Sequence, residues 1–193
     1  PRVPDGDEGQ AVMRTLRELR DGWRFVAGNR LVRSVIFGIA TGLFGGGMLV
    51  PLGPDFSKDV LGGGSAGFGL LLTALGLGVA VGIITLSLVQ RRLPQEHIFV
   101  AALLIAGVAI LTGASFNDLR PALIAVGLLG LSAGAVYVLG FTILQVNVEN
   151  DMRGRIFATL YTLVRLCLLL AFVLAPLLST LLDRMSQRWL DRD

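Results

Sequence analysis

The sequence predicts an all-α membrane protein, a polytopic bundle of about five transmembrane helices preceded by an amphipathic helix. Hydrophobic residues make up 53% of the 193 residues, charged residues only 16%, and the mean hydropathy is +0.72. A soluble domain carries about 25% charged residues, so this chain has too few to cover a water-facing surface. The charges also stand in short clusters between long uncharged runs, as in polytopic membrane proteins.

Five runs are long enough to cross the hydrocarbon layer, which takes about 20 residues. They are residues 34–54, 60–90, 98–117, 121–148 and 156–182, the last interrupted only by Arg165. Runs this long and uniformly apolar favour helices over the short alternating strands of an outer-membrane barrel. The predicted bundle occupies residues 30–183, with spans at about 32–55, 65–90, 97–116, 121–147 and 156–182.

The segment before the bundle, residues 1–29, is predicted to be a cytoplasmic linker that contains an amphipathic helix. Its apolar residues repeat at helical spacing, and Gly28 and Asn29 can end the helix. They are Val12, Leu16, Leu19, Trp23 and Val26. A basic amphipathic helix before a span lies along the membrane surface, packs under the bundle, or binds a specific lipid or partner. After the bundle, residues 184–193 form a polar tail.

Small residues recur every four positions within three spans. They are Gly38, Gly42 and Gly46, then Ala74, Gly78 and Gly82, then Gly130 and Gly134. Such stripes let helix backbones approach closely, and they also suit helices that slide or rock.

Two further features are expected to disturb helices. Gly45–Gly47 followed by Pro51 and Pro54 weakens the end of the first span, and Pro176 kinks the fifth.

The distribution of Lys and Arg predicts that the N-terminus is cytoplasmic. Eleven of these residues precede the first span or lie in the second-to-third and fourth-to-fifth connections, against five on the opposite side. This bias follows the positive-inside rule. The arginine-rich tail is discordant, because it lies outside if all five spans insert.

Arg165 is the sharpest candidate for function. It lies nine residues after Ile156, about 13 Å into the fifth span, where an arginine normally faces a cavity or a partner. Tyr161 and Thr162 share its helical face. Arg165 can contact a substrate or a gate, fix helix packing through an ion pair or a carbonyl, or reach the interface by snorkelling.

Further candidates lie in and after the fourth span. Tyr137 can line the same cavity or bond to a neighbouring helix. Asp151, Arg153 and Arg155 fall in the cytoplasmic loop between the fourth and fifth spans, where they can hold one conformation through contacts with helix ends or serve only as a topology signal. His97 and Cys167 are expected to be passive.

Three segments together resemble the second half of a bacterial major facilitator superfamily transporter, in the branch of drug and siderophore exporters. These segments are residues 16–25, residues 29–33 and the sequence from Val148 to Ala158, which contains Arg-Gly-Arg. The resemblance implies two six-helix halves rocking about a central cavity, with helices seven to eleven in this chain. It extends to transporters fused to thymidylate kinase. The loop 90–94 lacks the acidic residue of the family's loop motif, so no salt-bridge gate is carried over there.

The function that follows is transmembrane transport, by efflux of a small molecule, in a multi-pass protein of the inner (plasma) membrane. The alternative is a non-transporting anchor or scaffold for a fused domain such as a nucleotide kinase. An enzyme is disfavoured because the spans lack converging carboxylates and histidines, and no cofactor, metal or nucleic acid is expected. The expected partners are the lipid bilayer, the missing N-terminal half of the transporter, a small-molecule substrate and a coupling proton.

Overall fold

The computed structural model describes residues 20, 24, 26–90, 93–148 and 150–190, except the side chains of 150–152 and 181–190. Its elements are α2 (Arg30–Asp55), the π-helical turn η1 (Phe56–Val60), α3 (Gly64–Val89), α4 (Gln95–Ala114), α5 (Leu119–Asn147) and α6 (Asn150–Leu190). Within the described residues five helices are long and apolar enough to cross a membrane. The predicted all-α bundle with five spans is confirmed.

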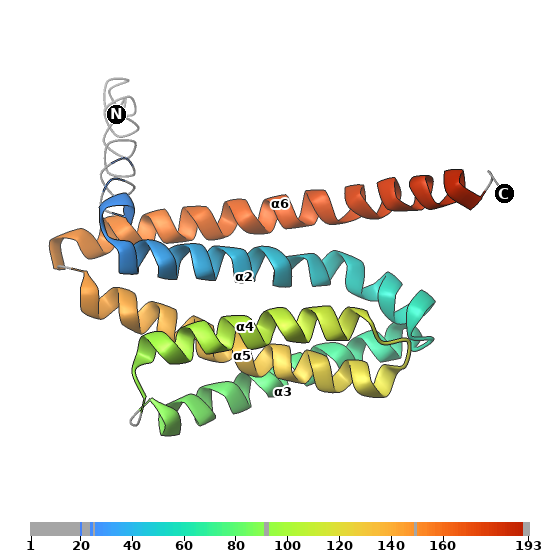
Figure 1. Cartoon of the computed structure of the whole chain (residues 1–193), viewed down its shortest axis with the longest axis horizontal. Helices are drawn as coiled ribbons and strands as arrows, with labels where there is room; N and C mark the ends of the chain where they lie inside the picture. The colour runs from blue at the N-terminus through green and yellow to red at the C-terminus, as the bar shows by residue number, and fades with distance from the viewer. Residues whose placement is uncertain (1–19, 21–23, 25, 91–92, 149, 191–193) are drawn as a thin grey trace, which may run out of the picture.

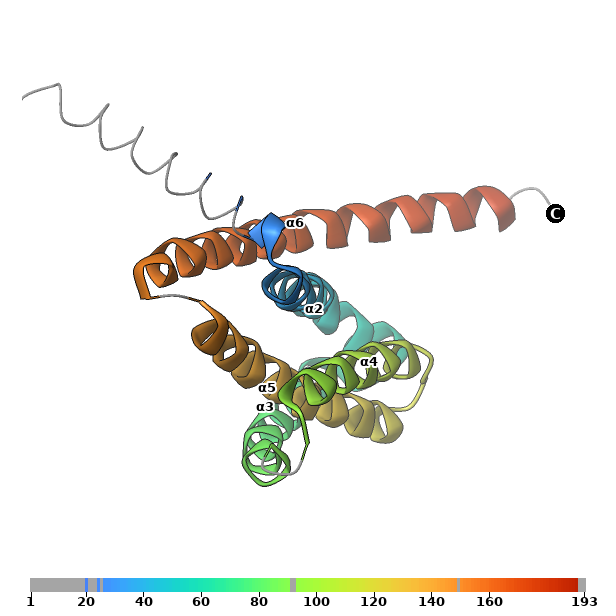
Figure 2. The same cartoon turned by 60° about the vertical axis from the view of Figure 1, so that its left-hand side comes forward.

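The helices form two groups (Figures 1 and 2). Helices α3, α4 and α5 pack together, and α6 lies on the far side of α2 from them. Helix α2 therefore stands between α6 and the other three helices. The main hydrophobic core lies where α2 and α4 begin and α5 ends, and it is centred on the buried side chains of Ile36, Leu139, Leu144, Ile156 and Leu160.

Helix α2 begins where the sequence predicts a break. The Asn29 side chain accepts hydrogen bonds from the backbone N–H groups of Leu31 (3.1 Å) and Val32 (3.2 Å), so it caps the helix. Val26, the last apolar residue of the predicted amphipathic helix, is buried in the main core. The other four, Val12, Leu16, Leu19 and Trp23, lie outside the described residues.

At its other end α2 remains helical through Pro51 and Pro54 and continues into η1. The chain then turns at Gly62 and Gly64, which have φ angles of +64° and +58°. This left-handed backbone is accessible to glycine without strain, and it lets α3 start directly after the turn. The Ser57 hydroxyl in the first turn of η1 is buried and donates to the Gly64 carbonyl oxygen at 2.9 Å, which holds the turn against η1.

Helix α6 differs from the expectation at both ends. It begins at Asn150, so the residues predicted to form a loop are helical. It then continues through Pro176 to Leu190, and so includes most of the predicted polar tail. Hydropathy predicts where a span leaves the lipid, but it does not predict where the helix ends, because polar residues such as Gln and Arg also form helices readily. A helix therefore extends beyond its apolar span at no local penalty.

Candidate functional site: a polar face on helix α6

Arg165 lies near the middle of the apolar span of α6. This span runs from Arg153 to Thr180, and Arg165 stands 12 residues after its start and 15 residues before its end. At 1.5 Å per residue these separations are about 18 Å and 22 Å. Arg165 is exposed, and among the described residues it has no hydrogen-bond or ion-pair partner.

The opposite face of α6 is packed against α2. The small side chains Ala171 and Ala175 are buried there, and a Cβ built at Gly47 of α2 would lie 3.0 Å from Leu168 and 3.2 Å from Ala171. This close packing fixes the rotation of α6 about its axis. Consequently Tyr161, Thr162 and Arg165 lie on the exposed side of α6, which α2 does not cover.

The hydroxyl of Thr162 is used within its own helix. It donates a hydrogen bond to the carbonyl oxygen of Ala158 at 2.9 Å, although the residue is exposed. Thr162 can therefore offer an approaching group only the free lone pair of this oxygen. Arg165, with its five N–H donors, is the strongest polar group on the face.

An aromatic cluster joins Tyr137 on α5 to Tyr161 on α6. Phe141 lies at its centre, with ring centroids 4.7 Å from Tyr137, 5.7 Å from Phe157 and 6.4 Å from Tyr161. These separations are those of interacting aromatic pairs. Tyr137 and Tyr161 remain 55% and 53% exposed, so the cluster presents two tyrosine rings beside the Arg165 face.

Sequence reasoning missed Phe141 and Phe157, although the sequence contains a signal for them. Tyr137 and Phe141 are four residues apart, as are Phe157 and Tyr161, and the two pairs are equally distant from residue 149 in the short α5–α6 connection. Two helices joined by a short connection bring such equidistant positions together at the connected end. The two pairs therefore meet across the turn.

The residues expected in a cytoplasmic loop lie instead at the start of α6. Asp151, Arg153 and Arg155 all belong to its first turns, because the connection from α5 is only a few residues long. The Arg153 guanidinium donates to the carbonyl oxygens of Val148 (Nε, 3.2 Å) and Gln145 (Nη2, 2.8 Å). It thus satisfies carbonyl groups at the C-terminus of α5, where a positive charge is favourable. The side chain of Asp151 is outside the described part.

The other titratable candidates from the sequence lie apart from the polar groups around Arg165. His97 is exposed in the first turn of α4, and Cys167 is half-buried on α6. Within the described ranges no group of three or more His, Cys, Asp or Glu residues is placed to hold a metal ion. The chemistry that this arrangement supports is recognition by one arginine and by aromatic rings.

The five apolar helices define a polytopic membrane protein with a polar face on one span. Comparison with family models matches residues 9–170 to the transmembrane secretion effectors of the major facilitator superfamily. The match covers most of the chain, and the chain belongs to this family. It is therefore a multi-pass membrane protein of a transporter family. Searches of curated proteins and of solved structures gave no match.

Proposed function

We propose that the chain is part of a twelve-helix secondary transporter that expels a small molecule by alternating access. In this proposal α2 to α6 are helices seven to eleven, and the uncovered face of α6 lines the central cavity. The observation that carries the proposal is an exposed arginine near the middle of an apolar span. A charge at this depth is costly in lipid and is normally placed toward water or a partner.

The groups on this face indicate the chemistry of the substrate. The planar guanidinium of Arg165 can bind a carboxylate or phosphate group through two parallel hydrogen bonds. The rings of Tyr137 and Tyr161 offer apolar faces with a hydroxyl at the edge. A small organic anion with an apolar portion fits both features. The uncharged runs of this chain hold no carboxylate, so a residue that carries a coupling proton belongs to the other half.

The same proposal places the N-terminus in the cytoplasm and the protein in the cell's inner membrane. The arginines before α2 and at the starts of α4 and α6 support this orientation through the positive-inside rule. The end of the bundle that contains the main core and the Arg153 contacts then faces the cytoplasm. The end that contains η1 and the start of α5 faces outward.

Substitution of Arg165 tests the proposal. Arg165→Leu should lower the apparent affinity for an anionic substrate on the order of 10- to 100-fold, because one charged hydrogen-bonding group is lost. Arg165→Lys should retain the charge and lose the bidentate geometry, giving an intermediate loss. Transport by the intact protein in proteoliposomes, measured as KM and maximal rate, is compared with the thermal unfolding midpoint in detergent.

A matched control is Leu104→Ala on α4, where an exposed leucine in another span is shortened. This variant should transport like the wild type. Wild-type transport by Arg165→Leu would remove Arg165 from the substrate path. A large fall in the unfolding midpoint of both Arg165 variants would assign the residue to packing.

A further inference from the structure

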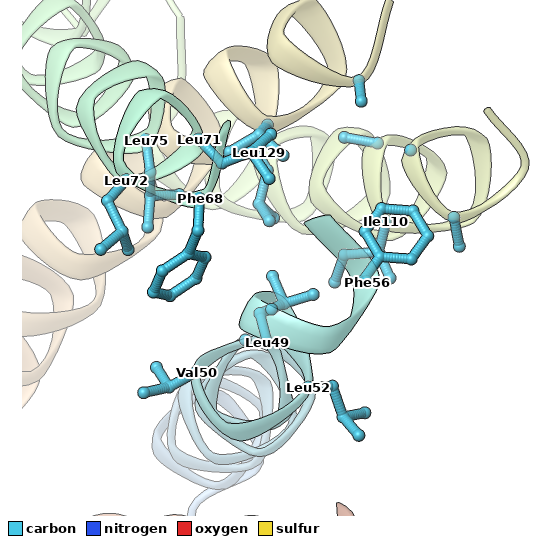
Figure 3. A pocket seen from close by; sticks show the side chains of 17 residues that line it. Leu49, Val50, Leu52, Phe56, Phe68, Leu71, Leu72, Leu75, Ile110 and Leu129 are labelled. Atoms are coloured by element: carbon cyan, nitrogen blue, oxygen red, sulfur yellow. The ribbon is translucent and has the colours of Figure 1, made fainter. Parts of the chain in front are cut away.

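A second feature lies at the opposite end of the bundle from the main core. There α2, η1, α3, α4 and α5 enclose a cavity of about 240 Å³. Figure 3 shows the side chains of Phe68, Leu72 and Leu75 from α3 facing those of Leu49 and Val50 from α2. The cavity does not include Arg165 or the aromatic cluster, so it is separate from the α6 face.

Every one of the 17 lining residues is apolar or glycine. A cavity of about 150 Å³ with such a lining excludes water and accepts benzene, so this larger one suits an apolar group longer than a single ring. Three glycines, Gly46, Gly53 and Gly113, contribute to its walls. A Cβ built at Gly46 would meet nothing within 4 Å, which shows that the space beside it is open.

The cavity opens toward the surroundings of the bundle rather than being sealed inside it. Two of its lining residues, Val50 on α2 and Leu72 on α3, are 50% and 47% exposed, whereas Leu71, Ala109 and Leu129 at other walls are buried. In a membrane-spanning protein the medium at such an apolar opening is lipid. An acyl chain can therefore reach the cavity sideways from the bilayer.

Charged residues of both signs lie near the level of the cavity at this end of the helices. Lys58 follows the lining residue Phe56 by two positions, and Arg120 precedes the lining residue Ala122 by two. Both are exposed, and so are the nearby acidic residues Asp55, Asp59 and Asp118. A zwitterionic headgroup, which carries a phosphate and an ammonium group, complements this mixed set better than a purely anionic one.

We propose that the cavity binds an acyl chain of a zwitterionic phospholipid, with the headgroup at the level of Lys58 and Arg120. The proposal requires that the bundle is embedded in lipid and that the opening of the cavity faces the bilayer. It does not depend on substrate, direction or mechanism of transport. Lipid occupancy would fill the space between α2 and the α3–α5 group, and so stabilise this loosely packed end of the bundle.

Photocrosslinking tests the proposal. The intact protein is reconstituted in nanodiscs with phosphatidylethanolamine that carries a diazirine in the middle of one acyl chain, and labelled peptides are identified by mass spectrometry. The wild type should be labelled at the cavity-lining parts of α2 and α3. Gly46→Leu places a side chain in the open space and should lower this labelling about tenfold, since the acyl chain loses its apolar contacts.

The matched control is Gly42→Leu, one turn earlier on α2, where an added Cβ also meets nothing within 4 Å but the residue does not line the cavity. Its labelling should equal that of the wild type. The same probe made with phosphatidylglycerol should label more weakly. If Gly46→Leu does not fold, Leu72→Trp at the opening replaces it, with the same expected loss.

Two results would overturn the proposal. One is the absence of label from the lining peptides of the wild type, which is the outcome if another part of the protein or a second copy fills the cavity. The other is undiminished labelling in a folded Gly46→Leu or Leu72→Trp variant.

Discussion

At the scale of single residues, Arg153 shows how a charge at the end of a helix can fix a connection. The carbonyl groups at a helix C-terminus lack partners within the helix. Arg153 in the first turn of α6 donates to two such groups from the end of α5, at Gln145 and Val148. The side-chain amide of Asn147 donates to the Ile143 carbonyl oxygen at 2.9 Å in the same region. The position of α6 relative to α5 is thus set by polar contacts as well as by the aromatic cluster.

Replacing Arg153 by Gln should destabilise the protein by about 1–2 kcal/mol, because both hydrogen bonds from the guanidinium are lost at a partly exposed site. Arg153→Lys should recover only part of this, since one ammonium group cannot reproduce the forked geometry. Denaturant unfolding in mixed micelles measures the effect, with Arg30→Gln, an exposed arginine at the start of α2, as the control. Equal stability of Arg153→Gln and the control would show that the two contacts contribute nothing measurable.

At the scale of helices, glycines determine which pairs make close contact. Helices α3 and α5 approach so closely that a Cβ at Gly78 or Gly82 would collide with the backbone carbonyl groups of Gly127 or Leu131. Gly130 and Gly134 on α5 face Leu75 and Val79 in the same way. The predicted packing role of these two stripes is confirmed. Of the three glycines in the α2 stripe, Gly38 is packed against Phe99 and Leu103, whereas Gly42 and Gly46 have open space around them.

This difference gives a prediction within one helix. Gly78→Ala should destabilise the bundle by about 1–3 kcal/mol, because the added methyl group forces α3 and α5 apart. Gly76→Ala should be neutral or stabilising by up to about 1 kcal/mol, since its Cβ meets nothing and alanine favours helix. Thermal unfolding of both variants in the same detergent is the measurement. A Gly78→Ala variant as stable as Gly76→Ala would contradict the close contact between α3 and α5.

The sequence was sufficient for the five spans and for the break at Gly28 and Asn29, because hydropathy and the conformational preferences of these two residues are local properties. It was insufficient to predict which glycines make close helix contacts. Gly42 and Gly78 belong to stripes with the same spacing, but only Gly78 lies against the backbone of a neighbouring helix. The start of α6 was placed too late because charged residues were interpreted as a loop. To predict the aromatic cluster, one would have to compare residues of α5 and α6 that are equally distant from the connection between these helices.

At the scale of the whole molecule, the two ends of the bundle differ. The main core and the Arg153 contacts join α2, α5 and α6 at one end, while the other end contains the apolar cavity and a smaller core cluster around Leu61, Leu71 and Ala122. The uncovered face of α6 runs between these ends and carries Arg165 near its middle. A transporter that rocks about a central site needs such a face to be open to water.

The most direct test of this account is the water accessibility of Thr162, one turn from Arg165. Single cysteines replace Thr162, Asn117, Glu96 or Leu104 in a Cys167→Ala background, and a membrane-impermeant maleimide is applied to intact cells and to inside-out vesicles. Asn117→Cys should react only in cells, Glu96→Cys only in vesicles, and Leu104→Cys in neither. The account predicts that Thr162→Cys reacts from both sides, because alternating access exposes the α6 face in turn to each. Failure of Thr162→Cys to react from either side, as for Leu104→Cys, would contradict it.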